Sequence, residues 1–133
     1  MNIAIVTADF NSEITHKMEA IAKKHASKLG ANIKKIIHVP GAFEIPFAVK
    51  KLIKQKEIDG IITLGAVIKG DTSHDEVVAN NASQQIIRLS LDYEKPVSLG
   101  IIGPNATKQQ VIERSEDYAK RAAEAAIKML SIK

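Results

Sequence analysis

The sequence predicts an α/β fold, a three-layer αβα sandwich built on a four-stranded parallel sheet. Short apolar runs rich in β-branched residues alternate with longer segments that carry apolar residues at helical spacing. This strand–helix alternation occurs four times, which is typical of a parallel sheet with helices on both faces. No linker, repeat or low-complexity segment interrupts it, so residues 1–133 are expected to form a single domain.

The first half of the chain supplies two strand–helix units. Residues 2–8 are apolar throughout and predict a strand buried on both faces. The first helix should begin with Ser12 as its N-cap and end at Gly30. Residues 32–39 start with polar side chains, which predicts a strand at the edge of the sheet. Pro46 fits the first turn of the second helix, where its missing N–H does no harm.

The second half repeats the pattern. Residues 59–64 predict a third strand, followed by a loop and a helix that opens near Asp75 and runs to about residue 91. Residues 95–101 predict a fourth strand, and Thr107 should cap the last helix. Right-handed crossovers and four strands favour a flavodoxin-like sheet of order 2-1-3-4.

Composition excludes several classes of function. The net charge of +4 is mild, and the lysines are spread along helices, which argues against a nucleic-acid surface. The chain contains no cysteine, so disulfides and thiolate metal sites are excluded. The start of the chain lacks a basic leader, and no apolar run approaches the ~18 residues of a membrane span. We therefore expect a cytoplasmic protein with no membrane or nucleic-acid partner.

The strongest functional signal is the loop that follows the third strand. It combines two glycines, two hydroxyls, a histidine and two acids within residues 65–76. Ligands of open α/β sheets bind where strands reach their carboxyl ends, and a following helix start can hold an anion. This pattern predicts a phosphate site beside one titratable group. The alternative is a polar loop whose histidine only caps a helix.

Distinctive residues follow the other strands too. They are Phe10 and Asn11 after the first strand, residues 42–44 after the second, and the turn at 103–104 after the fourth. All should lie at one edge of the sheet. Asp9 alone does not make a Mg²⁺-binding acidic pocket, which needs several carboxylates. The first loop also lacks the glycines of a mononucleotide phosphate loop.

Four motifs in register resemble the lumazine synthase family, and its archaeal members above all. They are FN at 10–11, PGAFEIP at 40–46, GAVIKGDTSH at 65–74 and ER at 113–114. The resemblance covers nearly the whole chain. It implies a transferase that condenses 5-amino-6-(D-ribitylamino)uracil with 3,4-dihydroxy-2-butanone 4-phosphate, giving 6,7-dimethyl-8-ribityllumazine, phosphate and water in riboflavin biosynthesis. It implies no cofactor and no metal.

The resemblance also implies roles for individual residues. His74 would shuttle protons, since imidazole titrates near neutral pH. Thr72, the backbone N–H of Asp71 and the guanidinium of Arg114 would hold the phosphate. A further group would bind the pyrimidine and its ribityl chain: Phe10, which would stack on the ring, Asn11, Ala42, Phe43, Glu44, Ala66, Val67, Ile68 and Leu99. Without the resemblance, Phe10 and Phe43 could equally be core aromatics.

In the family, subunits assemble as pentamers with sites between neighbours, and some members close pentamers into a shell. Leu99 matches a position that reaches the site of the adjacent subunit, and Lys120 resembles a lysine near the phosphate end in some members. Three alternatives remain open: an archaeal-type riboflavin synthase, a non-catalytic flavin- or lumazine-binding module, and a generic flavodoxin-like interaction domain.

Overall fold

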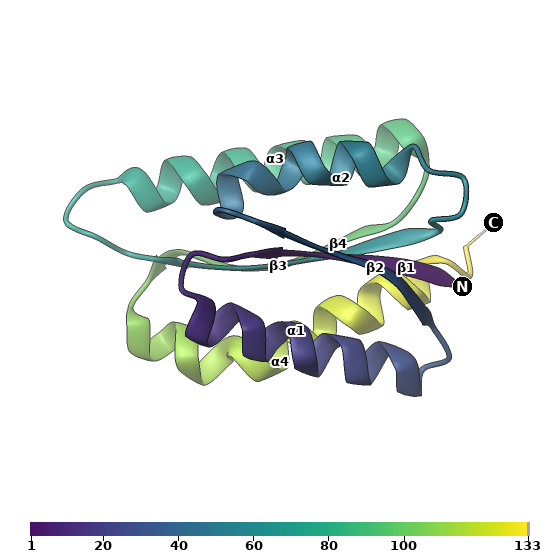
Figure 1. The fold of residues 1–133 in the computed structure, drawn as a ribbon. Helices are drawn as coiled ribbons and strands as arrows, with labels where there is room; N and C mark the ends of the chain where they lie inside the picture. Colours follow the sequence, from purple (N-terminus) through teal and green to yellow (C-terminus); the bar gives the residue numbers. More distant parts are fainter. Residues whose placement is uncertain (133) are drawn as a thin grey trace.

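A computed structural model describes residues 1–132, in which strands and helices alternate along the chain (Figure 1). A short 3₁₀ helix, η1, precedes the second α-helix. The elements are β1 (Asn2–Ala8), α1 (Ser12–Lys28), β2 (Asn32–Val39), η1 (Ala42–Glu44), α2 (Ile45–Ile53), β3 (Gly60–Ile68), α3 (His74–Tyr93), β4 (Val97–Ala106) and α4 (Lys108–Met129). The fold is the predicted flavodoxin-like α/β fold.

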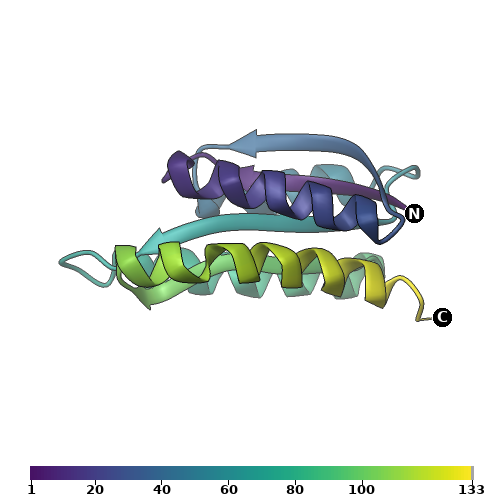
Figure 2. The same ribbon diagram turned by 90° about the horizontal axis from the view of Figure 1, so that it is seen from below.

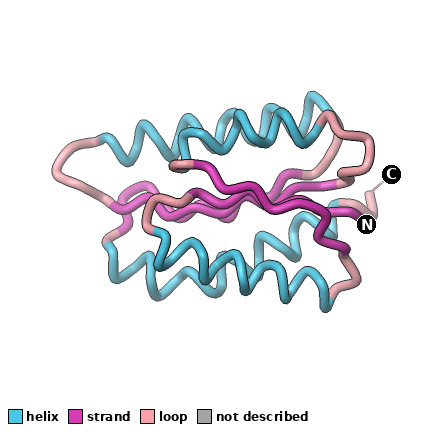
Figure 3. The backbone as a smooth tube through the Cα atoms, in the orientation of Figure 1, coloured by secondary structure: helices cyan, strands magenta, loops and turns pink. Residues whose placement is uncertain are grey.

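The sheet has the order β2-β1-β3-β4 and is parallel at every pairing, which confirms the predicted topology. The polar start of β2 correctly indicated an edge strand, since β2 pairs only with β1. Because the strands are parallel, their carboxyl ends meet at one edge, and the loops that leave them gather there (Figure 3). The candidate site lies at this edge.

Helices cover both faces of the sheet. In Figure 1, α2 and α3 lie on one face and α1 and α4 on the other; Figure 2, viewed from below, shows α1 and α4 side by side. Two apolar clusters fill the layers between sheet and helices. Ile61 and Val49 belong to the cluster under α2 and α3, and Ile5 and Met18 to the cluster over α1 and α4. None of the helices within residues 1–132 has the length and apolar character needed to cross a membrane.

The predicted ends of two strands were wrong. β3 continues to Ile68 instead of ending at residue 64, and β4 extends to Ala106. The reason is pairing: Gly65 lies opposite Ile101 and Ala66 opposite Ile102. Glycine often interrupts a strand, but here the strand continues through Gly65 because its backbone pairs with β4. The first four residues of the expected third loop, 65–68, therefore belong to the strand, and the first three of them are buried.

The helix caps were predicted in part. Asn11, in a left-handed conformation with φ of 64°, is the N-cap of α1, and Ser12 is already helical. Thr107 caps α4 as predicted: its hydroxyl accepts a hydrogen bond from Gln110 N, and the Gln110 side chain accepts one from Thr107 N. Pro46 lies in the first turn of α2, also as predicted.

Candidate active site

A cavity of about 640 Å³ opens at the carboxyl edge of the sheet, on the face covered by α2 and α3. Its walls come from the ends of β1 and β3, the β2–η1 connection and the start of α3. The residues that line it are Ala8, Phe10, Pro40, Gly41, Ala42, Phe43, Glu44, Ala66, Val67, Ile68, Gly70, Thr72, His74, Asp75, Val77 and Val78. The volume is in the range of small-molecule binding sites.

Two phenylalanines line the cavity while most of their surface stays open to solvent. Phe10 is 71% exposed and Phe43 57% exposed. Exposure of this extent excludes the interpretation of these rings as core aromatics. A large apolar side chain left this open is available to cover a ligand or a protein surface. Both rings are therefore placed to contact a flat heterocycle in the cavity.

Asn11 joins two of the loops and does not line the cavity. Its side-chain Nδ2 donates a 2.8 Å hydrogen bond to the carbonyl oxygen of Ala66 in β3. The backbone N–H of Phe10 donates to the carbonyl of Pro40 over 2.9 Å. These two bonds attach the loop after β1 to β3 and to the β2–η1 connection. Asn11 thus positions the wall that carries Phe10.

The loop between β3 and α3 brings Thr72 and His74 to the cavity wall. His74 is the first residue of α3, and its backbone N–H lies 3.3 Å from the Thr72 hydroxyl oxygen, which accepts the hydrogen bond. Both side chains are exposed. Asp71, in contrast, is not among the lining residues. Thr72 and His74 therefore both line the cavity at a helix start, where an anion is favoured.

Sequence reasoning missed the structural role of Asp75. Its carboxylate is 5% exposed, lines the cavity, and accepts a 2.9 Å hydrogen bond at Oδ2 from the backbone N–H of Asn105. This bond ties the end of β4 to the first turn of α3. The only sequence signal was an acidic residue in a first helical turn, which normally indicates no more than a favourable dipole interaction.

Glu44 places a carboxylate on the opposite wall. Its Oε1 lies 3.2 Å from the position that a Cβ atom would take on Gly41, so the side chain folds back over that glycine. Glycine at 41 leaves room for this close approach. The cavity therefore has a hydrogen-bond acceptor at the η1 side and the Thr72–His74 pair at the α3 side.

Leu99 and Arg114 are not brought to this cavity by their own chain. Leu99 is 48% exposed and lines a separate hollow of about 380 Å³ with Tyr118, Arg121 and other residues of α4. Arg114 is exposed on α4, across the sheet from α2 and α3. Within residues 1–132, the residues that line the larger cavity include no lysine and no arginine. A phosphate bound there would lack a cationic side chain from the same chain.

The arrangement can be compared with known proteins. The model of the 6,7-dimethyl-8-ribityllumazine synthase family matches residues 1–133. The chain belongs to the lumazine synthase family. Among its relatives are lumazine synthases of Methanothermobacter thermautotrophicus (54% identity, covering 97% of this chain and 92% of that protein), Metallosphaera sedula (53%; 97% and 85%) and Methanocaldococcus jannaschii (51%; 98% and 92%).

Membership of the lumazine synthase family confirms the resemblance that the four motifs carry. The structure brings most of the expected site residues together at one cavity: Phe10, Ala42, Phe43, Glu44, Ala66, Val67, Ile68, Thr72 and His74. Asn11, Asp71, Leu99 and Arg114 lie outside its walls. Hydrogen bonds join the loop after β1 to Pro40 and to Ala66 in β3, and the Asn105–Asp75 bond joins β4 to α3.

Proposed function

We propose that this cavity is where the chain carries out the lumazine synthase reaction of riboflavin biosynthesis. In that reaction 5-amino-6-(D-ribitylamino)uracil condenses with 3,4-dihydroxy-2-butanone 4-phosphate, releasing 6,7-dimethyl-8-ribityllumazine, phosphate and water. The observation that carries the proposal is the convergence of two exposed phenylalanines and the Thr72–His74 pair on one cavity of about 640 Å³. A heterocycle and a short phosphorylated chain need different surroundings, and the cavity offers both.

The pyrimidine would bind against the apolar wall. Phe10 can stack on its ring. Backbone groups near Val67 and Ile68, at the end of β3, can form hydrogen bonds with the polar edge of that ring. Glu44 can accept hydrogen bonds from the hydroxyls of the ribityl chain. Because Asn11 already donates to the Ala66 carbonyl, its contribution is to hold this wall in place.

The phosphorylated substrate would bind at the start of α3. The Thr72 hydroxyl and backbone N–H groups of the loop can donate to phosphate oxygens, with the helix dipole favouring the negative charge. Asp71 would take part through its backbone N–H only, because its carboxylate repels an anion. His74, two residues after Thr72, would move protons during imine formation, phosphate loss and ring closure.

A neighbouring subunit would complete the site. We propose a homopentamer, with larger shells of pentamers as a further possibility, in which Arg114 and Leu99 of one copy face the cavity of the next. The support is that both are exposed on their own chain and away from its cavity, which lacks a lysine or arginine wall within residues 1–132. We also propose a cytoplasmic location, as suits an enzyme that makes a small-molecule precursor.

The proposal is tested by mixing the protein with the two substrates and recording lumazine fluorescence together with phosphate release. We expect one phosphate per lumazine formed and no product when either substrate is omitted. Absence of lumazine formation by folded protein would overturn the proposal. A parallel incubation with the lumazine alone tests the riboflavin synthase alternative, since riboflavin would form there only if that alternative were correct.

A further inference from the structure

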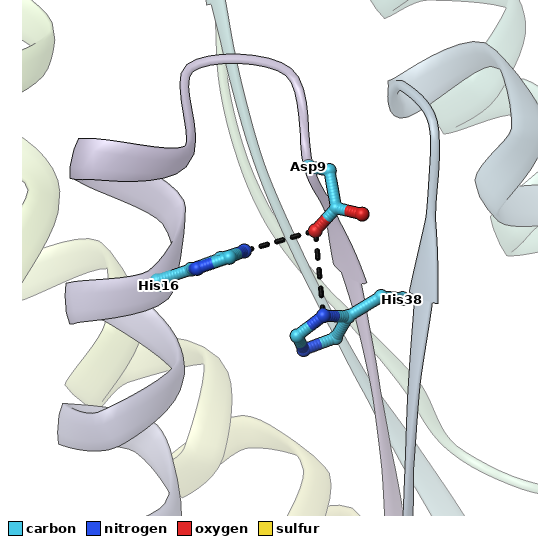
Figure 4. Close-up of side chains that lie close together, drawn as sticks. All are labelled: Asp9, His16 and His38. Carbon is cyan, nitrogen blue, oxygen red and sulfur yellow. Dashed lines mark hydrogen bonds and ion pairs between the residues drawn. The ribbon is translucent and has the colours of Figure 1, made fainter.

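A cluster outside the cavity, near the carboxyl ends of β1 and β2, consists of Asp9, His16 and His38. Asp9 follows β1, His16 lies in the second turn of α1, and His38 is near the end of β2 (Figure 4). Asp9 Oδ1 lies 2.9 Å from His16 Nε2 and 3.3 Å from His38 Nδ1. Within residues 1–132, this is the only group of three or more histidine and acidic side chains whose ligand atoms all lie within 4.8 Å of one another.

A second layer of contacts orients His38. Its Nε2 lies 2.6 Å from Glu19 Oε1, and the hydroxyl of the fully buried Thr7 donates to the same oxygen over 2.7 Å. A carboxylate only accepts, so a neutral His38 must carry its proton on Nε2. The lone pair of Nδ1 is then directed at Asp9. A carboxylate behind a histidine in this way is the usual second layer of a metal site.

Two of the three spacings between the ligand atoms suit a small divalent ion, and the third is within 4.8 Å. Tetrahedral zinc sites with bonds of ~2.0–2.1 Å place neighbouring ligand atoms about 3.3 Å apart. The two distances from Asp9 Oδ1 are close to that value, and the His16 and His38 rings lie together with centroids 4.9 Å apart. The side chains are 40–48% exposed, which leaves room for water as a fourth ligand.

We propose that Asp9, His16 and His38 bind a divalent transition-metal ion of the zinc type, with Glu19 as the residue that orients His38. Two imidazole nitrogens and one carboxylate oxygen favour such an ion over Mg²⁺ or Ca²⁺, which prefer oxygen ligands. The ion would join α1 to the ends of β1 and β2. Its role would be to hold these elements together, because none of its three ligands lines the cavity.

The test is a titration of chelator-treated full-length protein with Zn²⁺ by calorimetry and with Co²⁺ by visible absorption. We expect one ion per chain and a Co²⁺ spectrum of low coordination number. His16→Ala and His38→Ala should each weaken binding by at least tenfold, and Glu19→Ala by ~10–100-fold. Zn²⁺ should raise the melting temperature of the wild type and not that of His38→Ala.

His25→Ala is the matched control, because His25 also pairs with a carboxylate, Glu124, at 2.8 Å but has no third ligand in the cluster. It should bind one ion as tightly as the wild type. Circular dichroism of each metal-free variant separates loss of binding from loss of fold, and His16→Asn provides a second, milder change at an exposed position. Absence of stoichiometric binding to the wild type, or equal weakening by His25→Ala and His38→Ala, would overturn the proposal.

Discussion

His74 is the only histidine among the residues that line the cavity, and it stands beside Thr72 at the start of α3. That these two residues lie at the same edge of the sheet could be predicted, because they follow the carboxyl end of a parallel strand. The role of Asp75 could not be predicted. An acid in a first helical turn has the same appearance in sequence whether it faces solvent or accepts a bond from a distant strand, as Asp75 does from Asn105.

Replacing His74 by alanine should slow turnover by ~10²–10⁴-fold without abolishing it, because general acid–base catalysis typically contributes that factor. The measurement is the steady-state rate of lumazine formation at saturating concentrations of both substrates. His25→Ala, at the α1–α4 contact, is the control and should keep the wild-type rate. Full turnover by His74→Ala would remove this residue from the mechanism.

Replacing Arg114 by alanine should raise KM for the phosphorylated substrate far more than KM for the pyrimidine, because a guanidinium pairs with phosphate by charge and paired hydrogen bonds. Arg88→Ala, an exposed arginine on α3, serves as the control and should leave both constants unchanged. Equal increases in the two KM values after Arg114→Ala would contradict the assignment of Arg114 to the phosphate.

The existence and order of the helices and strands could be predicted because the spacing of apolar residues and the identity of capping residues are local features of the sequence. The bounds of β1 and β2, the cap at Thr107 and the first-turn position of Pro46 follow from such signals. The ends of β3 and β4 depend on pairing between the two strands, across about 35 residues of sequence, as in the contact of Thr63 with Ser98. Local signals cannot supply that pairing, so Gly65 was misread as a strand end.

Close packing between β4 and its neighbours leaves no room for a side chain at Gly100. A Cβ atom there would lie 2.5 Å from the Thr63 carbonyl oxygen and 3.0 Å from Ala122 Cβ. Gly100→Ala should lower the free energy of unfolding by ~1–3 kcal/mol or more through overpacking, as measured by urea denaturation. Gly70→Ala is the matched control, since a Cβ at 70 meets nothing within 4 Å and should change stability little. Equal stability of the two variants would contradict this packing.

The bond from Asn105 N–H to the buried Asp75 carboxylate links β4 to α3. Asp75→Ala removes the acceptor and should cost ~1–3 kcal/mol of unfolding free energy, because the donor loses its charged partner. Thermal or urea unfolding measures the loss. Asp117→Ala, which removes an exposed carboxylate 3.5 Å from Arg121, should change stability by a few tenths of a kcal/mol at most. An equal loss of unfolding free energy in both variants would show that the Asn105–Asp75 bond contributes no more to stability than the exposed ion pair does.

At the scale of the whole molecule, the parallel sheet decides where the site lies, because it brings the ends of β1, β2 and β3 to one edge. That placement could be predicted from the strand–helix alternation. The positions of Leu99 and Arg114 relative to the cavity could not, because they depend on how copies of the chain meet. On a single chain both residues are exposed and lie away from the cavity.

The most direct test of a site shared between copies is complementation. His74→Ala and Arg114→Ala chains are co-expressed in equal amounts, and the rate of lumazine formation is compared with that of each variant alone, at a concentration of the phosphorylated substrate well below the KM of the Arg114→Ala variant. If His74 and Arg114 act from different chains, about one quarter of the mixed sites carry both intact residues. The mixture should then regain roughly that share of wild-type activity. A mixture no faster than the average of the two variants would contradict a site formed by His74 and Arg114 of different chains.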